Sequence, residues 1–83
     1  MSETHEHRLK RMRMRSWRRG TKEMDLILGP FADRMLAGMT VEELDLFDEM
    51  LEENDQDLYQ WASGQASTPD KFASLIKILT PDT

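Results

Sequence analysis

The sequence predicts an all-α protein, a small five-helix bundle built as a single domain. Apolar residues recur at spacings of three and four along most of the chain, which is typical of helices with one buried face, and no useful stretch alternates with the period of two of a strand. The 83 residues include no cysteine, so hydrophobic burial has to hold one modest domain together. We expect the domain at residues 6–80, a disordered N-terminal tail at 1–5 and a C-terminal tail at 81–83.

The first two helices are predicted from their apolar stripes and stop signals. The first is expected at residues 6–19, where basic residues surround a narrow apolar stripe, and Gly20 should supply a left-handed helix stop. The second is expected at residues 21–36. Pro30 should bend it, because a proline inside a helix removes one backbone hydrogen bond and clashes with the preceding turn.

Three further helices follow from capping signals. Residues 40–43, Thr-Val-Glu-Glu, form a capping box, in which a threonine and a glutamate satisfy each other's backbone amides, and the helix they start should end at Asn54. Asp55 is expected to cap a fourth helix that Gly64 ends. A fifth is expected at residues 68–79, opened by Thr-Pro-Asp.

Two aromatic residues are predicted to be largely buried. Phe47 and Trp61 each lie on the apolar face of their expected helix. Because losing a large buried aromatic side chain costs about 3 to 5 kcal/mol, Trp61→Ala is expected to lower the melting temperature markedly.

The charges divide the chain into two electrostatic parts. Residues 8–22 contain eight arginines or lysines and no acid, whereas residues 23–83 contain three basic residues and fourteen acids, so a net charge of −5 conceals a basic first helix. Clustered arginine is typical of nucleic-acid binding, but the acidic remainder would repel a polyanion. On the residues alone, charge balance between the first and third helices is an equally good explanation.

No enzyme is expected, because none of the residue patterns that carry catalysis is present. His5 and His7 point to different sides of a helix and make a poor metal site, and the acidic run at 42–53 is typical of a solvated helix face. Neither a phosphate loop nor a nucleophile elbow occurs. No apolar run could span a membrane, and the acidic start argues against a signal peptide or organelle presequence, so we expect a bacterial cytoplasmic protein.

The junction at residues 18–23, Arg-Arg-Gly-Thr-Lys-Glu, is the most informative segment. Arginine in a last helical turn and glutamate in the next first turn both suit the helix dipoles, which is sufficient as a purely structural explanation. The same corner would also expose an arginine fork and a carboxylate for bidentate pairing with a partner. Under that second interpretation Arg19 and Glu23 serve binding, and replacing either with alanine should leave the fold intact.

The junction resembles the signature of the FAD assembly factor family, called SdhE in bacteria and succinate dehydrogenase assembly factor in mitochondria. That signature is Arg-Gly-x-x-Glu, matched here by Arg19, Gly20 and Glu23. Residues 57–61, Asp-Leu-Tyr-Gln-Trp, resemble a second family segment, and Pro30-Phe31 follows the junction by one helical stretch. The likeness covers roughly residues 8–79.

The resemblance implies an assembly factor that binds the flavoprotein subunit of succinate dehydrogenase, and in bacteria also that of fumarate reductase, and promotes covalent attachment of FAD there. The sequence has no dinucleotide-binding fingerprint, so we assign no cofactor to the chain itself and expect it to act on FAD attachment in the partner. Whether the chain contacts FAD is left open by the residues, and we expect a monomer when free. The alternative is a small helical adaptor or nucleic-acid-binding domain that uses the basic first helix. The partner-binding residues expected from the resemblance and the surrounding sequence are Arg18, Arg19, Gly20, Thr21, Lys22, Glu23 and Asp25.

Overall fold

The computed structural model describes residues 3–79, and these form five α-helices with two short 3-10 turns and no strand. The helices are α1 (His5–Trp17), α2 (Lys22–Met35), α3 (Val41–Met50), α4 (Asp55–Ser63) and α5 (Ala73–Leu79). The 3-10 turns η1 (Leu36–Gly38) and η2 (Asp70–Phe72) precede α3 and α5. The all-α, five-helix prediction is therefore confirmed for this part of the chain.

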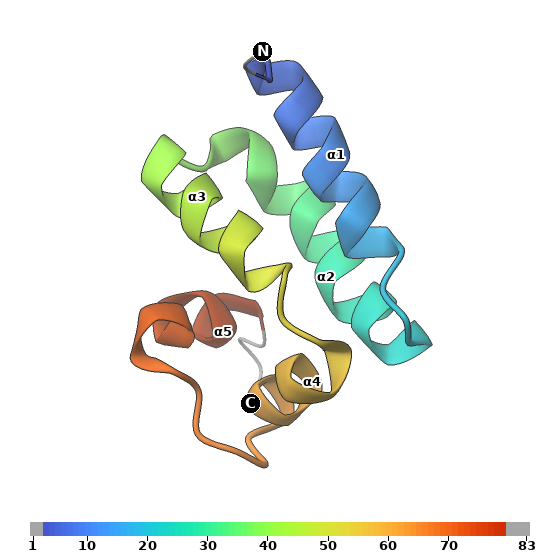
Figure 1. Cartoon of the computed structure of the whole chain (residues 1–83), viewed down its shortest axis with the longest axis vertical. Coiled ribbons are helices and arrows are strands. Elements are labelled where there is room, and N and C mark those ends of the chain that lie inside the picture. The colour runs from blue at the N-terminus through green and yellow to red at the C-terminus, as the bar shows by residue number, and fades with distance from the viewer. Residues whose placement is uncertain (1–2, 80–83) are drawn as a thin grey trace.

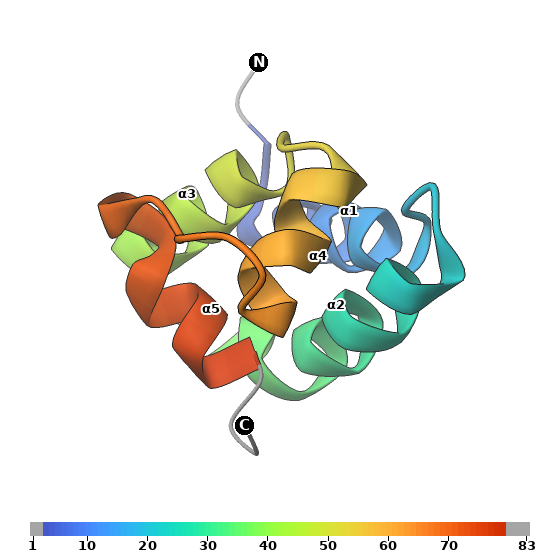
Figure 2. The ribbon, with the colours of Figure 1, turned by 90° about the horizontal axis from the view of Figure 1, so that it is seen from below.

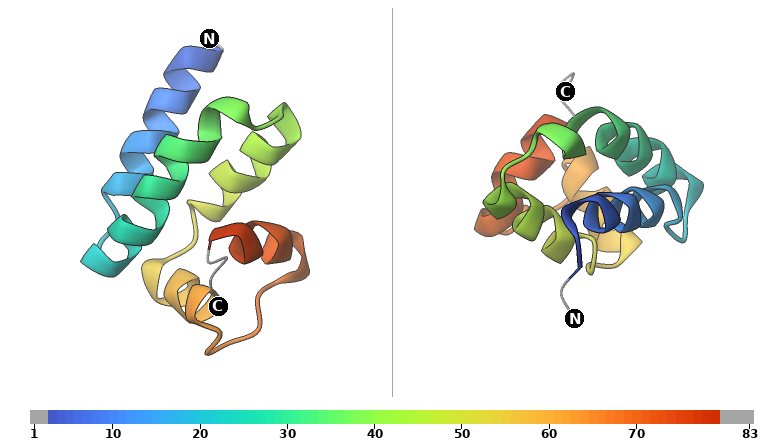
Figure 3. Two further views of the ribbon diagram at one scale, coloured as in Figure 1. Left: turned by 180° about the vertical axis from the view of Figure 1, so that it is seen from behind. Right: turned by 90° about the horizontal axis from the view of Figure 1, so that it is seen from above.

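The helices pack in two groups around one core. Figure 1 shows α1 and α2 side by side with α3 next to them, while α4 and α5 lie across the end of the molecule away from the N-terminus. The views from below and from behind show the same grouping (Figures 2 and 3). Every helix contributes to the core, whose fully buried large side chains include Met12, Met24, Leu28, Phe31, Leu36, Leu44, Phe47, Met50, Leu51, Leu58 and Phe72.

Local capping sets the helix boundaries. Thr40 and Glu43 form the predicted capping box at the start of α3, with Thr40 N donating to Glu43 Oε1 at 2.8 Å and Glu43 N donating to Thr40 Oγ1 at 3.2 Å. Gly64 ends α4 in the left-handed conformation, with a φ of 81°. Both predictions are confirmed.

The first helix differs from its prediction at both ends. It begins at His5, one residue before the predicted start, because the Thr4 hydroxyl accepts the backbone amide of His7 and caps the helix. It ends at Trp17, and Gly20 does not have a positive φ. The expected tail residues 1–2 and 81–83 lie outside the described residues.

The helix α2 is unbroken at Pro30, where a bend was expected, and Trp61 is less buried than predicted. Within α2 the helix continues through Pro30 to Met35 without interruption, and the Phe31 ring still reaches α3, where its centroid lies 5.5 Å from that of Phe47. Phe47 is fully buried as predicted. Trp61 is only partly buried, because it packs against the rim of the core beside Phe72.

Candidate partner-binding site

The corner between α1 and α2 is tied to the corner between α3 and α4 through Arg19. Its guanidinium donates three hydrogen bonds, from Nε to Asp55 Oδ1 at 2.8 Å and from its two terminal nitrogens to the carbonyls of Leu51 and Glu53, each at 2.7 Å. These two carbonyls follow the last turn of α3, where backbone oxygens lack helical partners. Arg19 thus satisfies the end of one helix while pairing with the start of another.

Asp55 completes this corner by binding the backbone of the signature. Its Oδ2 atom accepts the amides of Gly20 at 2.6 Å and Thr21 at 3.1 Å. A side chain added at Gly20 would place its Cβ 3.4 Å from the same oxygen, which is an ordinary van der Waals contact. From the other side, Asp25 accepts the amide of Arg19 at 2.6 Å.

The helix cap that frees Asp55 was not predicted. Asn54, and not Asp55, caps α4, since Asn54 Oδ1 accepts the amide of Asp57 at 2.8 Å. Asp55 is then the first helical residue, and its carboxylate turns toward the α1–α2 corner. The local sequence permits either residue as the cap, and the ion pair with Arg19 favours this choice.

The guanidinium of Arg19 is consequently not exposed at the surface. Its side chain is 9% exposed and that of Asp55 is 12% exposed, so the expectation that Arg19 presents its guanidinium at the surface is wrong. The physical reason is that three acceptors inside the chain already match the geometry of the fork. The arginine and glycine of the signature therefore shape the corner.

Glu23 lies differently from Arg19. It is exposed, and its carboxylate makes no hydrogen bond or ion pair with residues 3–79. It lines a surface pocket of about 240 Å³, which we call the Glu23 pocket, together with Thr21, Asp55, Gln56 and Tyr59. Tyr59 is 41% exposed and supplies an aromatic wall.

The remaining predicted residues surround this pocket. Thr21 caps α2 by accepting the amide of Met24 at 3.3 Å. Arg18 and Lys22 are exposed and make no ion pair within the described residues, and Arg18 lines a shallow hollow that adjoins the pocket along Thr21, Asp55 and Gln56. The structure thus gathers all seven predicted residues at one corner, but it buries Arg19 and leaves Arg18, Lys22 and Glu23 exposed.

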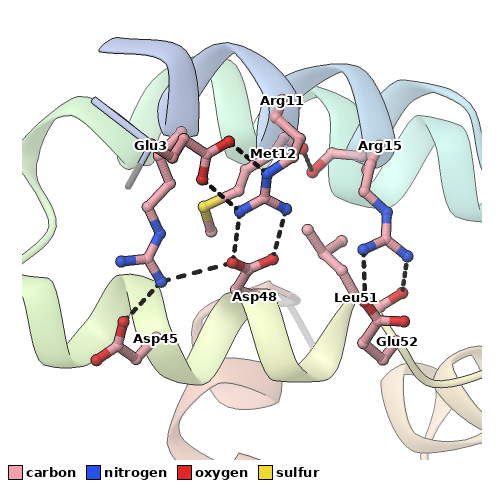
Figure 4. A network of polar contacts seen from close by, with 10 residues as sticks. Glu3, Arg11, Met12, Arg15, Asp45, Asp48, Leu51 and Glu52 are labelled. Atoms are coloured by element: carbon pink, nitrogen blue, oxygen red, sulfur yellow. Dashed lines mark hydrogen bonds and ion pairs between the residues drawn. The ribbon is translucent and has the colours of Figure 1, made fainter. Parts of the chain in front are cut away.

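The basic face of α1 is paired with α3. Arg8 contacts Asp45 at 2.6 Å, Arg11 pairs in bidentate fashion with Asp48 at 2.9 and 2.7 Å, and Arg15 contacts Glu52 at 2.8 Å (Figure 4). Each hydrogen-bonded pair is separated by 37 residues, so the two helices run parallel in register. Charge balance between the first and third helices, one of the two explanations that the sequence left open, is what the structure shows.

These contacts change the acidity of the groups involved. Hydrogen bonding to the Arg11 guanidinium lowers the pKa of Asp48 below the ordinary aspartate value, although partial burial opposes the shift. Asp48 and Glu3 in turn raise the pKa of Arg11. Arg15 lowers the pKa of Glu52 in the same way at a fully exposed position.

One close approach between α1 and α2 was not predicted. The Trp17 ring lies directly over Gly29, where a Cβ would come within 2.3 Å of the ring, and Trp17 Nε1 donates to Asp33 at 3.1 Å. The glycine before Pro30 is the signal that sequence reasoning could have used, because a mid-helix glycine often marks a close contact.

Comparison with known proteins identifies the family. The sequence model described as the flavinator of succinate dehydrogenase matches residues 10–81, which is most of the chain. The chain belongs to this family. Among its curated relatives, the succinate dehydrogenase assembly factor 2 of Debaryomyces hansenii is 41% identical over 89% of this chain, and that of Scheffersomyces stipitis is 38% identical over 96% of it. Assembly factor 2-B of Drosophila mojavensis is 35% identical over 89% of the chain.

The chain spans about half the length of these relatives, 57% for each of the two yeast proteins and 49% for the fly protein. All three relatives are named as mitochondrial proteins, which overturns the expectation of a bacterial cytoplasmic protein. The acidic start, on which that expectation rested, carries no information on compartment, since the chain covers only part of its relatives.

Residues 3–79 lack two further kinds of feature. No helix in this range is long and apolar enough to cross a membrane. No group of three or more histidine, aspartate or glutamate side chains there is placed to hold a metal ion.

Proposed function

We propose that this chain binds the flavoprotein subunit of succinate dehydrogenase and promotes covalent attachment of FAD to that subunit. The observation that carries the proposal is the family match over residues 10–81, since the family is described as the flavinator of succinate dehydrogenase. The relatives are named as assembly factors of the same enzyme, which supports a role in its maturation.

The corner at Arg19 is the proposed contact surface. Arg19 and Asp55 hold the α1–α2 corner against the α3–α4 corner, so the exposed side chains around it have a fixed backbone. Binding through groups that are already ordered loses less conformational entropy. Arg18, Lys22 and Glu23 are the charged groups that this corner offers to a partner.

The chain acts in this proposal as a binding protein and not as a catalyst. A binding protein accelerates its partner's reaction when it binds the reactive conformation more tightly than the resting one. FAD is attached to the flavoprotein, with no cofactor held by this chain. We extend the proposal to the flavoprotein of fumarate reductase, as the family resemblance implies, and we expect the free chain to be a monomer.

The test is complementation in a yeast strain that lacks its own assembly factor. The chain is expressed behind a mitochondrial targeting sequence, and covalent FAD on the flavoprotein is measured by in-gel fluorescence. The parent chain is expected to restore fluorescence. Failure of a well-expressed, folded parent chain to restore it would contradict the proposal.

A further inference from the structure

The Glu23 pocket combines features that select one kind of side chain. It is lined by the exposed residues Glu23, Tyr59 and Gln56, together with Thr21 and Asp55. The Asp55 carboxylate is already occupied, because Arg19 pairs with Oδ1 and two backbone amides bind Oδ2. Glu23 therefore supplies the one unpaired charge among the five lining residues.

We propose that the Glu23 pocket receives an arginine side chain of the partner protein, with its guanidinium between the Glu23 carboxylate and the Tyr59 ring. The proposal rests on the proposed function for the identity of the partner, the flavoprotein subunit, but the chemistry of the occupant follows from the pocket.

Charge excludes the other classes of occupant. A phosphate or carboxylate entering the pocket would be repelled by Glu23, and an apolar side chain would bury that carboxylate without a partner. A cation neutralises Glu23 and is attracted by the face of the Tyr59 ring.

Arginine fits this pocket better than lysine. The planar guanidinium can donate two parallel hydrogen bonds to a carboxylate and stack on an aromatic ring at the same time. The ammonium of lysine is a compact, strongly hydrated point charge that meets only one of these requirements well. An aromatic wall 41% exposed beside an unpaired carboxylate is therefore a site for a guanidinium.

The first experiment measures the affinity of purified flavoprotein subunit for the folded chain and its variants by calorimetry. Glu23→Gln removes the charge with little change of shape and is expected to weaken binding at least tenfold. The matched control is Glu42→Gln, which removes one exposed and unpaired carboxylate from the first turn of α3 and should leave affinity within twofold.

The aromatic wall is tested separately. Tyr59→Phe retains the ring and should bind like the parent, whereas Tyr59→Leu retains bulk without the ring and should bind about 2- to 30-fold more weakly, as expected for a lost cation–π contact. Circular dichroism melts establish that each variant is folded. Unchanged flavoprotein affinity in Glu23→Gln would overturn the proposal.

A second experiment does not depend on the flavoprotein. The ¹⁵N-labelled chain is titrated with N-acetylarginine amide and, as a neutral isostere, N-acetylcitrulline amide. The arginine compound should shift the amide signals of Thr21, Glu23, Gln56 and Tyr59, and the citrulline compound should not. If the parent chain fails to bind the flavoprotein, the proposed function is wrong, but the titration still tests the pocket. Equal shifts with both compounds, or no shifts with either compound, would refute the arginine site.

Discussion

Asp55 Oδ1 accepts a hydrogen bond from Arg19 Nε at 2.8 Å and joins two corners of the chain that are 36 residues apart in sequence. The same carboxylate binds the amides of Gly20 and Thr21, so one side chain orders the whole α1–α2 corner. The arginine of the family signature is thereby separated in role from its glutamate, since Arg19 is held inside the chain and Glu23 is exposed.

The first prediction is that removing either member of this pair destabilises the fold. Arg19→Ala leaves Asp55 and two carbonyls without their partner, and breaking a largely buried ion pair costs about 3 to 5 kcal/mol. Asp55→Asn retains a hydrogen-bond acceptor and should cost about 1 to 3 kcal/mol. Urea denaturation measures both free energies of unfolding.

Arg19→Lys and Asp70→Asn are the controls for this prediction. Lysine retains the charge but cannot serve three separate acceptors, so Arg19→Lys should also be less stable than the parent. Asp70 is exposed and its side chain makes no hydrogen bond or ion pair within residues 3–79, so Asp70→Asn should unfold much like the parent. An Arg19→Ala protein as stable as the parent would show that Arg19 does not hold the corner.

The second prediction concerns stability at low pH. Arg11 lowers the pKa of Asp48 in the folded state, so the ionised carboxylate is preferred by the native protein. This contribution is fully present above the unfolded-state pKa, about 3.9 for aspartate, and is lost as the pH falls through the lower folded-state value. Urea denaturation from pH 7 to pH 2.5 should show the loss below about pH 4.

Asp48→Asn isolates this contribution. The variant should be less stable than the parent at pH 7, and the difference should shrink as the pH falls, because the parent then loses the same charge. Glu3 and Glu52 have lowered pKa values too, but both carboxylates are exposed to solvent and should add little. A constant difference between parent and Asp48→Asn across the pH range would contradict the role of the Arg11 pair.

The third prediction concerns the Trp17 ring over Gly29. Alanine at position 29 improves helix propensity by about 1 kcal/mol, but its Cβ would overlap the ring, which has to move away. Trp17 would then lose its hydrogen bond to Asp33 and become more exposed. In a Trp61→Phe background, Gly29→Ala should shift the tryptophan emission to longer wavelength, while Gly38→Ala, where a Cβ meets open space, should not.

The helices themselves were predictable because their signals are local. The capping box at Thr40 and the stop at Gly64 depend on backbone groups within a few residues, and both occur as predicted. The role of Asp55 was not predictable in this way. Its carboxylate could cap α4 or reach Arg19, and the outcome depends on a contact 36 residues away.

The ion pairs between α1 and α3 were predictable only in part. The arginines at 8, 11 and 15 repeat the spacing of the acids at 45, 48 and 52, so the sequence contained the register, but only if the two helices were known to run parallel. The resemblance indicated the corner around Glu23, whose role in binding stays a prediction, whereas the burial of Arg19 required the packed structure.

The last prediction separates this chain from a nucleic-acid-binding domain. Phosphate contacts need arginines that are free to displace the counterions condensed on the nucleic-acid backbone, and binding by this route weakens steeply as salt rises. Here Arg8, Arg11 and Arg15 are already paired with carboxylates of α3, and those acids would face any duplex laid along α1. Fluorescence anisotropy with a labelled 20-base-pair duplex should therefore show no saturable binding at 150 mM salt. The variant Glu3→Gln/Asp45→Asn/Asp48→Asn/Glu52→Gln removes the carboxylates that pair with the three arginines within residues 3–79, and any increase in duplex binding should appear in this variant and disappear at high salt. Saturable binding of the duplex by the parent chain, with an affinity that falls steeply between 50 and 200 mM salt, would show that the basic helix serves nucleic acid after all.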